Sequence, residues 1–350
     1  MTHTPTAPDV EEWLNVLGRQ EAAGDIADPE PVSPDEARRR MRLLAVPAED
    51  HGRVLATLPD PARAPARWQA LRHCHRALFS QSAPAPRETA WPDAPAALGE
   101  AGRYFYVHLY LLALPLALER QRRLGIPDDI VAATFADVGA KMITYRLAHR
   151  TGGFDRQRWV MRHFRGTLHR LGRLQFERTT LDTAALGGPP GPDGPADGER
   201  VLSVHIPEDG PLTPARCAAS LRAARDFFTQ HFPDETVQFA TCSSWLLDDQ
   251  LAAYLPPPSN ILHFQRRFTR FGGRPVGDDD VLQFVFHVPL GTTDFDRLPQ
   301  RTTLQHAVVG HLRAGRHWRL SHGWTPLPAP SKATARPEAD AINSRQTPPS

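Results

Sequence analysis

The chain has 350 residues, of which 41% are hydrophobic and 23% are charged, as in ordinary soluble globular proteins. Its 41 basic and 39 acidic residues leave a net charge of +2, so bulk charge predicts no nucleic-acid partner and no membrane partner. Three cysteines are too few for a disulfide framework, and the N-terminus lacks a secretory signal pattern, so we expect a cytoplasmic protein. The excess of Arg over Lys, with abundant Ala and Pro, is typical of GC-rich bacterial genomes.

Residues 1–158 are predicted to form a helical domain. Apolar residues recur at helical spacing from Val10 to Leu17, and Pro34 begins a second helix with Ser33 as its N-cap. Further helices are expected over 66–78, 102–124 and 128–148. The most apolar run, 104–118, has about 15 residues, fewer than the roughly 20 that span a bilayer, and so predicts a buried helix.

From Trp159 to residue 325 the pattern changes to α+β. Alternating apolar and polar residues predict strands over 169–181, 201–207 and 237–247, and a helix from Pro214 to His231 capped by Thr213. Two more strands are expected over 261–268 and 281–290, a helix over 304–315, and an edge strand near 317–327. A Gly/Pro-rich segment, 187–199, bridges two strands, and the polar tail 326–350 is expected to be disordered. The second domain is therefore a mixed sheet of about five to seven strands.

The turn Glu208–Pro214 lies between a strand and a helix. The free backbone N–H groups of a helix N-terminus attract anions such as a pyrophosphate, and Gly210 allows a close backbone approach. The same residues also describe an ordinary strand-to-helix connection with a good N-cap, and Glu208 and Asp209 would repel a phosphate that they faced. Both interpretations remain open from composition alone.

His205 is the candidate general base, because imidazoles titrate near neutral pH and strand alternation places it beside Ser203. A half-buried histidine bonded to a neighbouring carbonyl would have the same pattern. Glu177 and Gln175, on the polar face of an adjacent strand, are further candidates for the base or for binding an amine.

The segments GRLQFE, HIPEDGPLT, CSSWLLDDQL and SNILHFQRRF resemble the bacterial two-domain acyltransferases, which combine a helical N-terminal domain with a GNAT-like C-terminal domain. GNAT denotes the Gcn5-related N-acetyltransferase fold. The resemblance covers most of residues 10–325. It implies an α+β fold, a helical domain followed by a GNAT-like mixed sheet flanked by helices, and acyl transfer from acyl-coenzyme A or a carrier-protein thioester to a small-molecule or peptide amine by direct attack.

The resemblance also implies roles for particular segments. The strand holding Val204 and Ile206 would pair with the pantetheine arm, and the turn Gly210, Pro211, Leu212 and Thr213 would cradle the pyrophosphate. The strand through Cys242 would splay away to admit the thioester. The sequence departs from the family at the turn, where PEDGPLT stands in place of Gln/Arg-x-x-Gly-x-Gly/Ala.

Cys242 and Ser243 lie where the second strand would diverge, so a thiol or hydroxyl there can protonate the leaving thiolate or orient the acceptor. A covalent Cys242 nucleophile with His205 is the other possibility, although no third group is evident. We expect no metal, because adjacent positions on a helix, as in His73-Cys74-His75, do not share a face. A non-catalytic binding or regulatory protein on a GNAT scaffold is the alternative to an enzyme.

Overall fold

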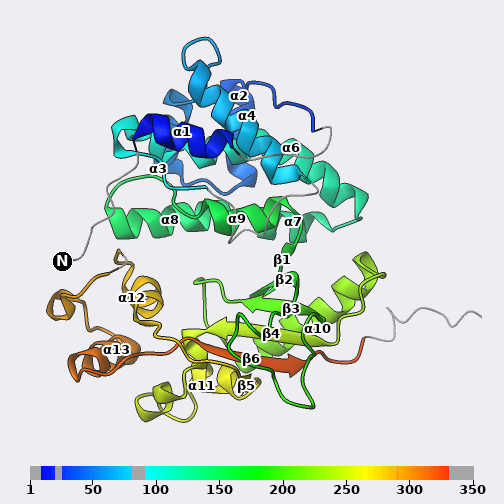
Figure 1. The fold of residues 1–350 in the computed structure, drawn as a ribbon, viewed down its shortest axis with the longest axis vertical. Coiled ribbons are helices and arrows are strands. Elements are labelled where there is room, and N and C mark those ends of the chain that lie inside the picture. Colours follow the sequence, from blue (N-terminus) through cyan, green and yellow to red (C-terminus); the bar gives the residue numbers. More distant parts are fainter. Residues whose placement is uncertain (1–8, 20–25, 81–90, 290, 331–350) are drawn as a thin grey trace, which may run out of the picture.

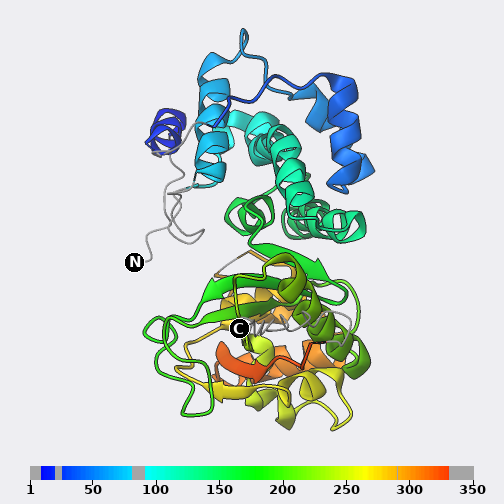
Figure 2. The ribbon, with the colours of Figure 1, turned by 90° about the vertical axis from the view of Figure 1, so that its right-hand side faces the viewer.

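The structure, a computed structural model, describes residues 9–19, 26–80, 91–289 and 291–330. A helical half lies above a half built around a β-sheet, and the two stay stacked when the view is turned by 90° (Figure 1, Figure 2). Most of the tail predicted to be disordered, from residue 331 onward, lies outside the described residues.

Amphipathic helices make up the N-terminal half. Ser33 accepts a hydrogen bond from the Glu36 N–H at 3.3 Å, so the predicted N-cap is confirmed. The helix predicted over 128–148 is divided at Ala136 into two helices. The helices are α1 (Val10–Gly18), α2 (Pro34–Leu43), α3 (Ala48–Ala56), α4 (Pro65–Phe79), α5 (Gly99–Arg103), α6 (Phe105–Arg123), α7 (Asp128–Phe135), α8 (Asp137–His149) and α9 (Gln157–Phe164), with a short 3-10 turn at Ala96–Leu98.

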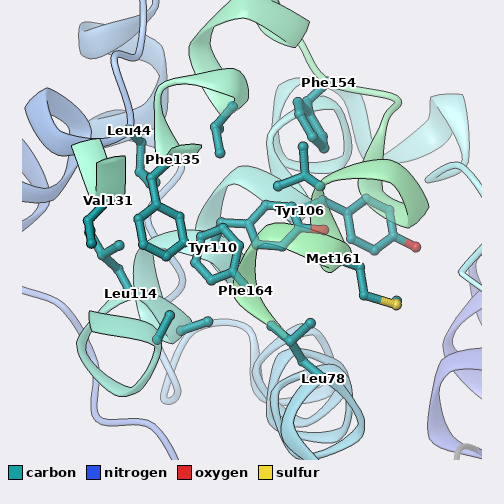
Figure 3. Close-up of a cluster of buried hydrophobic side chains, with 14 of the residues drawn as sticks. Leu44, Leu78, Tyr106, Tyr110, Leu114, Val131, Phe135, Phe154, Met161 and Phe164 are labelled. Carbon is teal, nitrogen blue, oxygen red and sulfur yellow. The ribbon is translucent and has the colours of Figure 1, made fainter. Parts of the chain in front are cut away.

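Aromatic rings fill the centre of this half. Tyr110 from α6 packs 4.5 Å from Phe164 of α9, which lies 4.9 Å from Phe135 of α7, measured between ring centroids (Figure 3). By length and composition, the helical stretch Ala96–Arg123 could cross a membrane, but 72% of its apolar window is buried inside the protein. The prediction of a buried core helix is therefore confirmed.

Gly139 of α8 provides a test of this packing. A Cβ at this position would lie 1.9 Å from the carbonyl oxygen of Ala45. The Gly139 N–H also donates to the Leu44 carbonyl at 3.0 Å, which holds the two backbones together. Gly139→Ala is expected to destabilise the protein by about 1–3 kcal/mol, the usual cost of overpacking, measured by denaturant unfolding. Gly52→Ala is the matched control, because the helical Gly52 has open space around its Cβ position and should gain about 0.5–1 kcal/mol.

The C-terminal half contains a mixed sheet with strand order β1-β2-β3-β4-β6-β5. Its strands are β1 (Leu168–Leu171), β2 (Leu174–Thr180), β3 (Arg200–His205), β4 (Phe239–Ser244), β5 (Thr269–Phe271) and β6 (Ser321–Pro326). All neighbours are antiparallel except β3 and β4, which the helix α10 (Pro214–His231) connects. Six strands agree with the predicted mixed sheet.

The sheet opens between its two central strands. β3 pairs with β4 through only Leu202 with Ala240 and Ser203 with Thr241. Past these pairs β3 continues along β2 as far as His205, and β4 continues along β6 as far as Ser244. Two three-stranded leaves therefore diverge, and among the described residues no strand pairs with their facing edges. We call this opening the fork; it is the splay that the family resemblance implies.

Two strand predictions were wrong, the strand predicted over 169–181 is divided into β1 and β2, and the strand predicted near 317–327 is not at an edge. Residues 261–268 belong mainly to α11 (Asn260–Gln265), because Ser259 caps the Ile261 N–H at 3.2 Å. Residues 281–290 begin inside α12 (Asp278–Phe286), whose acidic first turn complements the helix dipole. The segment 317–327 contains β6, which is an inner strand between β4 and β5 and not an edge.

One hydrophobic cluster runs through both halves of the molecule. It joins residues of the helices, such as Phe164, to residues of the sheet, such as Leu171, Phe176 and Leu202. A second cluster around Trp318 packs α11 and α12 against α13 (Thr303–Arg313), the helix predicted over 304–315.

Candidate active site

A cavity of about 920 Å³ occupies the fork and extends up to the helical half. The helical half contributes side chains from α8 and α9. The two sides of the fork are lined by β3 and β4, and the remaining wall is formed by α11, α12 and the start of α13. Its lining includes Lys141, Thr144, Arg156, Trp159, Arg173, Gln175, Val204, His205, Ile206, Gly210, Pro211, Leu212, Cys242, Ser243, Trp245, Leu246, Asn260, Ile261, Asp280, Phe284 and Leu304.

His205 lies on the β3 side of the fork and is tied to a carboxylate. Its Nε2 lies 3.0 Å from Oε2 of Glu177, the residue that strand register places opposite Ser203 on β2. Arg162 of α9 donates to both Glu177 oxygens, at 2.9 and 3.0 Å. Burial raises the pKa of Glu177, but the His205 hydrogen bond and the Arg162 charge outweigh burial, so the pKa lies below its ordinary value.

An ionised Glu177 fixes the tautomer of His205. A carboxylate can only accept, so the neutral imidazole donates its single N–H from Nε2 to Glu177. The lone pair is then on Nδ1, which has no hydrogen-bond partner among the described residues. His205 thus presents a basic nitrogen in the manner of a histidine oriented by a carboxylate.

Trp159 of α9 packs edge-on against His205, with ring centroids 4.7 Å apart. Its indole N–H donates to the buried Asp137 at 2.7 Å. His163 lies 3.2 Å and Lys141 3.9 Å from the same carboxyl group. Burial raises the pKa of Asp137, but the hydrogen bond to His163 and the Lys141 charge bring it well below its ordinary value. A buried ionised group therefore anchors the wall behind the imidazole.

Arg173 organises the turn that follows β3. Its Nη2 and Nε donate to the carbonyl oxygens of Gly210 and Pro211, at 2.7 and 3.2 Å. Arg173 is 7% exposed, and its Nη1 is buried without a hydrogen-bond partner. Gly210 has a φ of +93°, a left-handed conformation that glycine adopts without strain. Thr213 caps α10 through the Arg216 N–H at 3.4 Å, as predicted.

The two acids of this turn are each paired with a cation. Asp209 forms an ion pair with Arg170 at 2.9 Å. Glu208 lies 3.9 Å from Lys141 and 3.7 Å from the His287 ring. Arg170 and Lys141 therefore offset the negative charge that would repel an anion at the turn.

Cys242 and Ser243 are neighbours on β4 that point to opposite faces of the sheet. Cys242 is 1% exposed, packs in the main hydrophobic cluster, and burial raises the pKa of its thiol to about 12. Ser243 is exposed, and its Oγ lies 2.7 Å from Nδ1 of His322 on β6. A thiol that stays protonated is a poor nucleophile, which argues against a covalent role for Cys242.

The structure brings most of the predicted residues together. His205, Cys242, Ser243, Val204, Ile206, Gly210, Pro211 and Leu212 line the cavity, Glu177 contacts His205, and Thr213 caps the adjoining helix. Sequence reasoning missed Trp159 and His322 and did not single out Arg173 as the anchor of the turn. Within the described ranges, no group of three or more His, Cys, Asp or Glu side chains is arranged to hold a metal ion.

Comparisons with known proteins identify the family. Residues 35–166 match the N-acyltransferase N-terminal domain, and residues 168–325 match the GNAT-like C-terminal domain. An acyltransferase mutant solved with octanoyl-CoA is 36% identical, with a TM-score of 0.79, covering 90% of this chain and 94% of that one. The chain belongs to this two-domain acyltransferase family. This acyltransferase has no match among the curated proteins.

Two further solved structures have the same architecture. An acyltransferase in complex with decanoyl-CoA and teicoplanin is 36% identical, with a TM-score of 0.78, covering 90% of this chain and 94% of that one. Another, in complex with decanoyl-CoA, is 34% identical with a TM-score of 0.77, covering 92% of this chain and all of the other. The helical half and the GNAT-like sheet of this acyltransferase thus recur together in these proteins.

Proposed function

We propose that this acyltransferase moves an acyl group from acyl-coenzyme A to an amine of a small-molecule acceptor by direct attack. The observation that carries the proposal is the fork with the Glu177–His205 pair at its side, inside a cavity shared by both halves. An N-acyltransferase needs a thioester and an amine held together, with a base beside the amine. The related structures with bound acyl-CoA support the choice of donor.

The fork accepts the thioester. The unpaired edge of β3 at Val204, together with Ile206 just past the end of the strand, offers backbone groups to the amides of the pantetheine arm, as a missing strand would. The pyrophosphate lies at the turn Gly210–Thr213, where the N-terminus of α10 favours negative charge. Arg173 compensates for the absence of the usual glycine signature in this turn. Its hydrogen bonds hold the Gly210 and Pro211 carbonyl groups away from the anion, and its Nη1, which has no other partner, donates to the pyrophosphate.

His205 is the general base and Glu177 orients it. The amine nitrogen attacks the thioester carbonyl carbon, Nδ1 of His205 takes the proton that the nitrogen loses, and the C–S bond breaks as coenzyme A leaves with the electron pair on sulfur. The carboxylate of Glu177 stabilises the imidazolium that results. Ser243 lies at the leaving-group side of the fork, whereas Cys242 serves as packing.

The acceptor enters the cavity from the side of the helical domain. We assign residues 1–158 to this domain and residues 159–325 to the GNAT-like domain. Teicoplanin bound to a related acyltransferase supports a small-molecule acceptor that carries an amine. We place the enzyme in the cytoplasm of a bacterium, with neither a nucleic acid nor a membrane as its partner, in keeping with the net charge of +2.

Titration calorimetry with coenzyme A and octanoyl-CoA, followed by mass spectrometry of reactions with teicoplanin and simple primary amines, tests this function. The expected results are binding of both ligands and a product heavier by one octanoyl group on nitrogen. Failure to bind any acyl-CoA would refute the assignment and favour a regulatory protein on the same scaffold. Binding without transfer to any amine in the panel would refute the choice of acceptor.

A further inference from the structure

The two sides of the fork carry different polar groups at equivalent positions. Ser203 and Thr241 form the last parallel pair, and His205 and Ser243 each lie two residues further along their strands. Because alternate residues of a strand share a face, His205 and Ser243 lie on the same face of the diverging leaves. Both line the cavity. A thioester that enters the fork therefore has the imidazole on one side and a hydroxyl on the other.

We propose that the Ser243 hydroxyl, held by His322, donates a hydrogen bond to the sulfur of the departing coenzyme A thiolate. The inference rests on the proposed acyl transfer and adds a catalytic residue to it. When the C–S bond breaks, its electron pair moves to sulfur, while the new C–N bond has formed and His205 has taken the amine proton. The thiolate accepts the Ser243 hydrogen bond and then takes a proton from water, while His205 returns the amine proton to the hydroxide that remains, so that Ser243 keeps its own proton.

His322 is the positioning residue. It is 5% exposed, is register partner to Ser243 across β4 and β6, and its Nδ1 lies 2.7 Å from the Ser243 Oγ. With its N–H on Nδ1, the ring donates to Oγ, and the hydroxyl hydrogen is left to point into the cavity. The opposite tautomer would make Ser243 a nucleophile, but that arrangement needs a third group on Nε2. Among the described residues no carboxylate forms a hydrogen bond or ion pair with His322.

Replacing Ser243 by alanine removes the donor without disturbing the base. Ser243→Ala is expected to lower kcat with octanoyl-CoA by about 10- to 100-fold, the effect of losing a hydrogen bond to a charged group. The affinity for coenzyme A, measured by calorimetry, should stay the same. Ser203→Ala is the matched control, because this hydroxyl lies on the same face of β3 but in the closed part of the ladder. It should keep wild-type turnover.

Thioesters with different leaving groups distinguish a Ser243 hydroxyl that donates to the sulfur from one that only supports the structure. An S-aryl octanoyl thioester releases a weakly basic thiolate that needs little help, so Ser243→Ala should slow this substrate by less than about threefold. Equal losses with both thioesters would overturn the proposal. A wild-type enzyme that transfers octanoyl from octanoyl-CoA, together with an unaffected Ser243→Ala variant, would overturn this inference alone and leave the proposed function intact.

Substitution of His322 tests the hydrogen-bond direction. His322→Asn keeps an N–H donor near the position of Nδ1 and should retain activity within about threefold, whereas His322→Leu should fall as far as Ser243→Ala. Mass spectrometry of the enzyme with octanoyl-CoA and no amine should show no covalent adduct. An octanoyl group on Ser243, or an inactive His322→Asn variant that binds coenzyme A normally, would show instead that Ser243 is a nucleophile.

Discussion

Replacing His205 with alanine is expected to lower kcat by about 10²- to 10⁴-fold, the usual contribution of a general base. Coenzyme A affinity should not change, because the pantetheine and pyrophosphate contacts assigned to β3 and its turn use backbone groups and Arg173. The loss arises because Glu177 holds Nε2 and leaves Nδ1 as the proton acceptor. Pre-steady-state turnover with octanoyl-CoA, alongside calorimetry with coenzyme A, measures both quantities.

Two control variants make the result specific. His205→Gln retains a side-chain amide that can donate to Glu177 but cannot take a proton, so it should be as inactive as the alanine variant. His306→Ala removes an exposed histidine of α13 that lines no part of the cavity, and should behave as wild type. Turnover within about threefold of wild type in His205→Ala would remove this residue from the chemical step.

Arg173→Met is expected to weaken coenzyme A binding by about 10- to 100-fold, the effect of one lost charge-assisted hydrogen bond to a phosphate. The substitution also frees the Gly210 and Pro211 carbonyls, whose oxygens would then repel the pyrophosphate. Octanoyl-pantetheine, which has no phosphate groups, should keep its KM. Comparing the two donors separates a phosphate contact from general damage to the fork.

A conservative variant and a distant one accompany this measurement. Arg173→Lys keeps the charge but cannot donate to two carbonyls in one plane, so its affinity should fall between those of wild type and Arg173→Met. Arg222→Met removes an exposed arginine on α10 and should leave binding unchanged. Equal weakening of octanoyl-CoA and octanoyl-pantetheine in Arg173→Met would contradict a role at the phosphates.

The elements with strong local signals could be predicted from the sequence. Ser33 and Thr213 act as caps, the helices of the N-terminal half follow apolar spacing, and β2 and β3 follow alternation. The prediction of a strand over 281–290 was wrong because its apolar residues suit either structure. The helix is favoured by its acidic first turn, Asp278–Asp280, and by the packing of Val281 and Leu282 against α13. This packing is a tertiary effect.

The candidate site could be predicted only along single strands. His205 and Glu177 were found because alternation places each on a polar face, whereas Ser243 was found because the family resemblance makes the second strand diverge there. Their partners come from distant parts of the chain: Arg162 approaches Glu177 from α9, and His322 approaches Ser243 across 79 residues. Such pairs depend on the strand order and on the packing of the helical half, which no local pattern encodes.

The continuous hydrophobic cluster has a consequence for how this enzyme can be varied. Leu171, Phe176 and Leu202 of the sheet belong to the same cluster as the helices above them. The junction between the two family domains is therefore a packed interior and not a hinge between modules. A chimera that joins the helical half of one relative to the sheet of another would set mismatched side chains against each other within this cluster. Because the two halves share one hydrophobic core, we expect that acceptor selection and thioester binding cannot be exchanged independently between relatives of this enzyme.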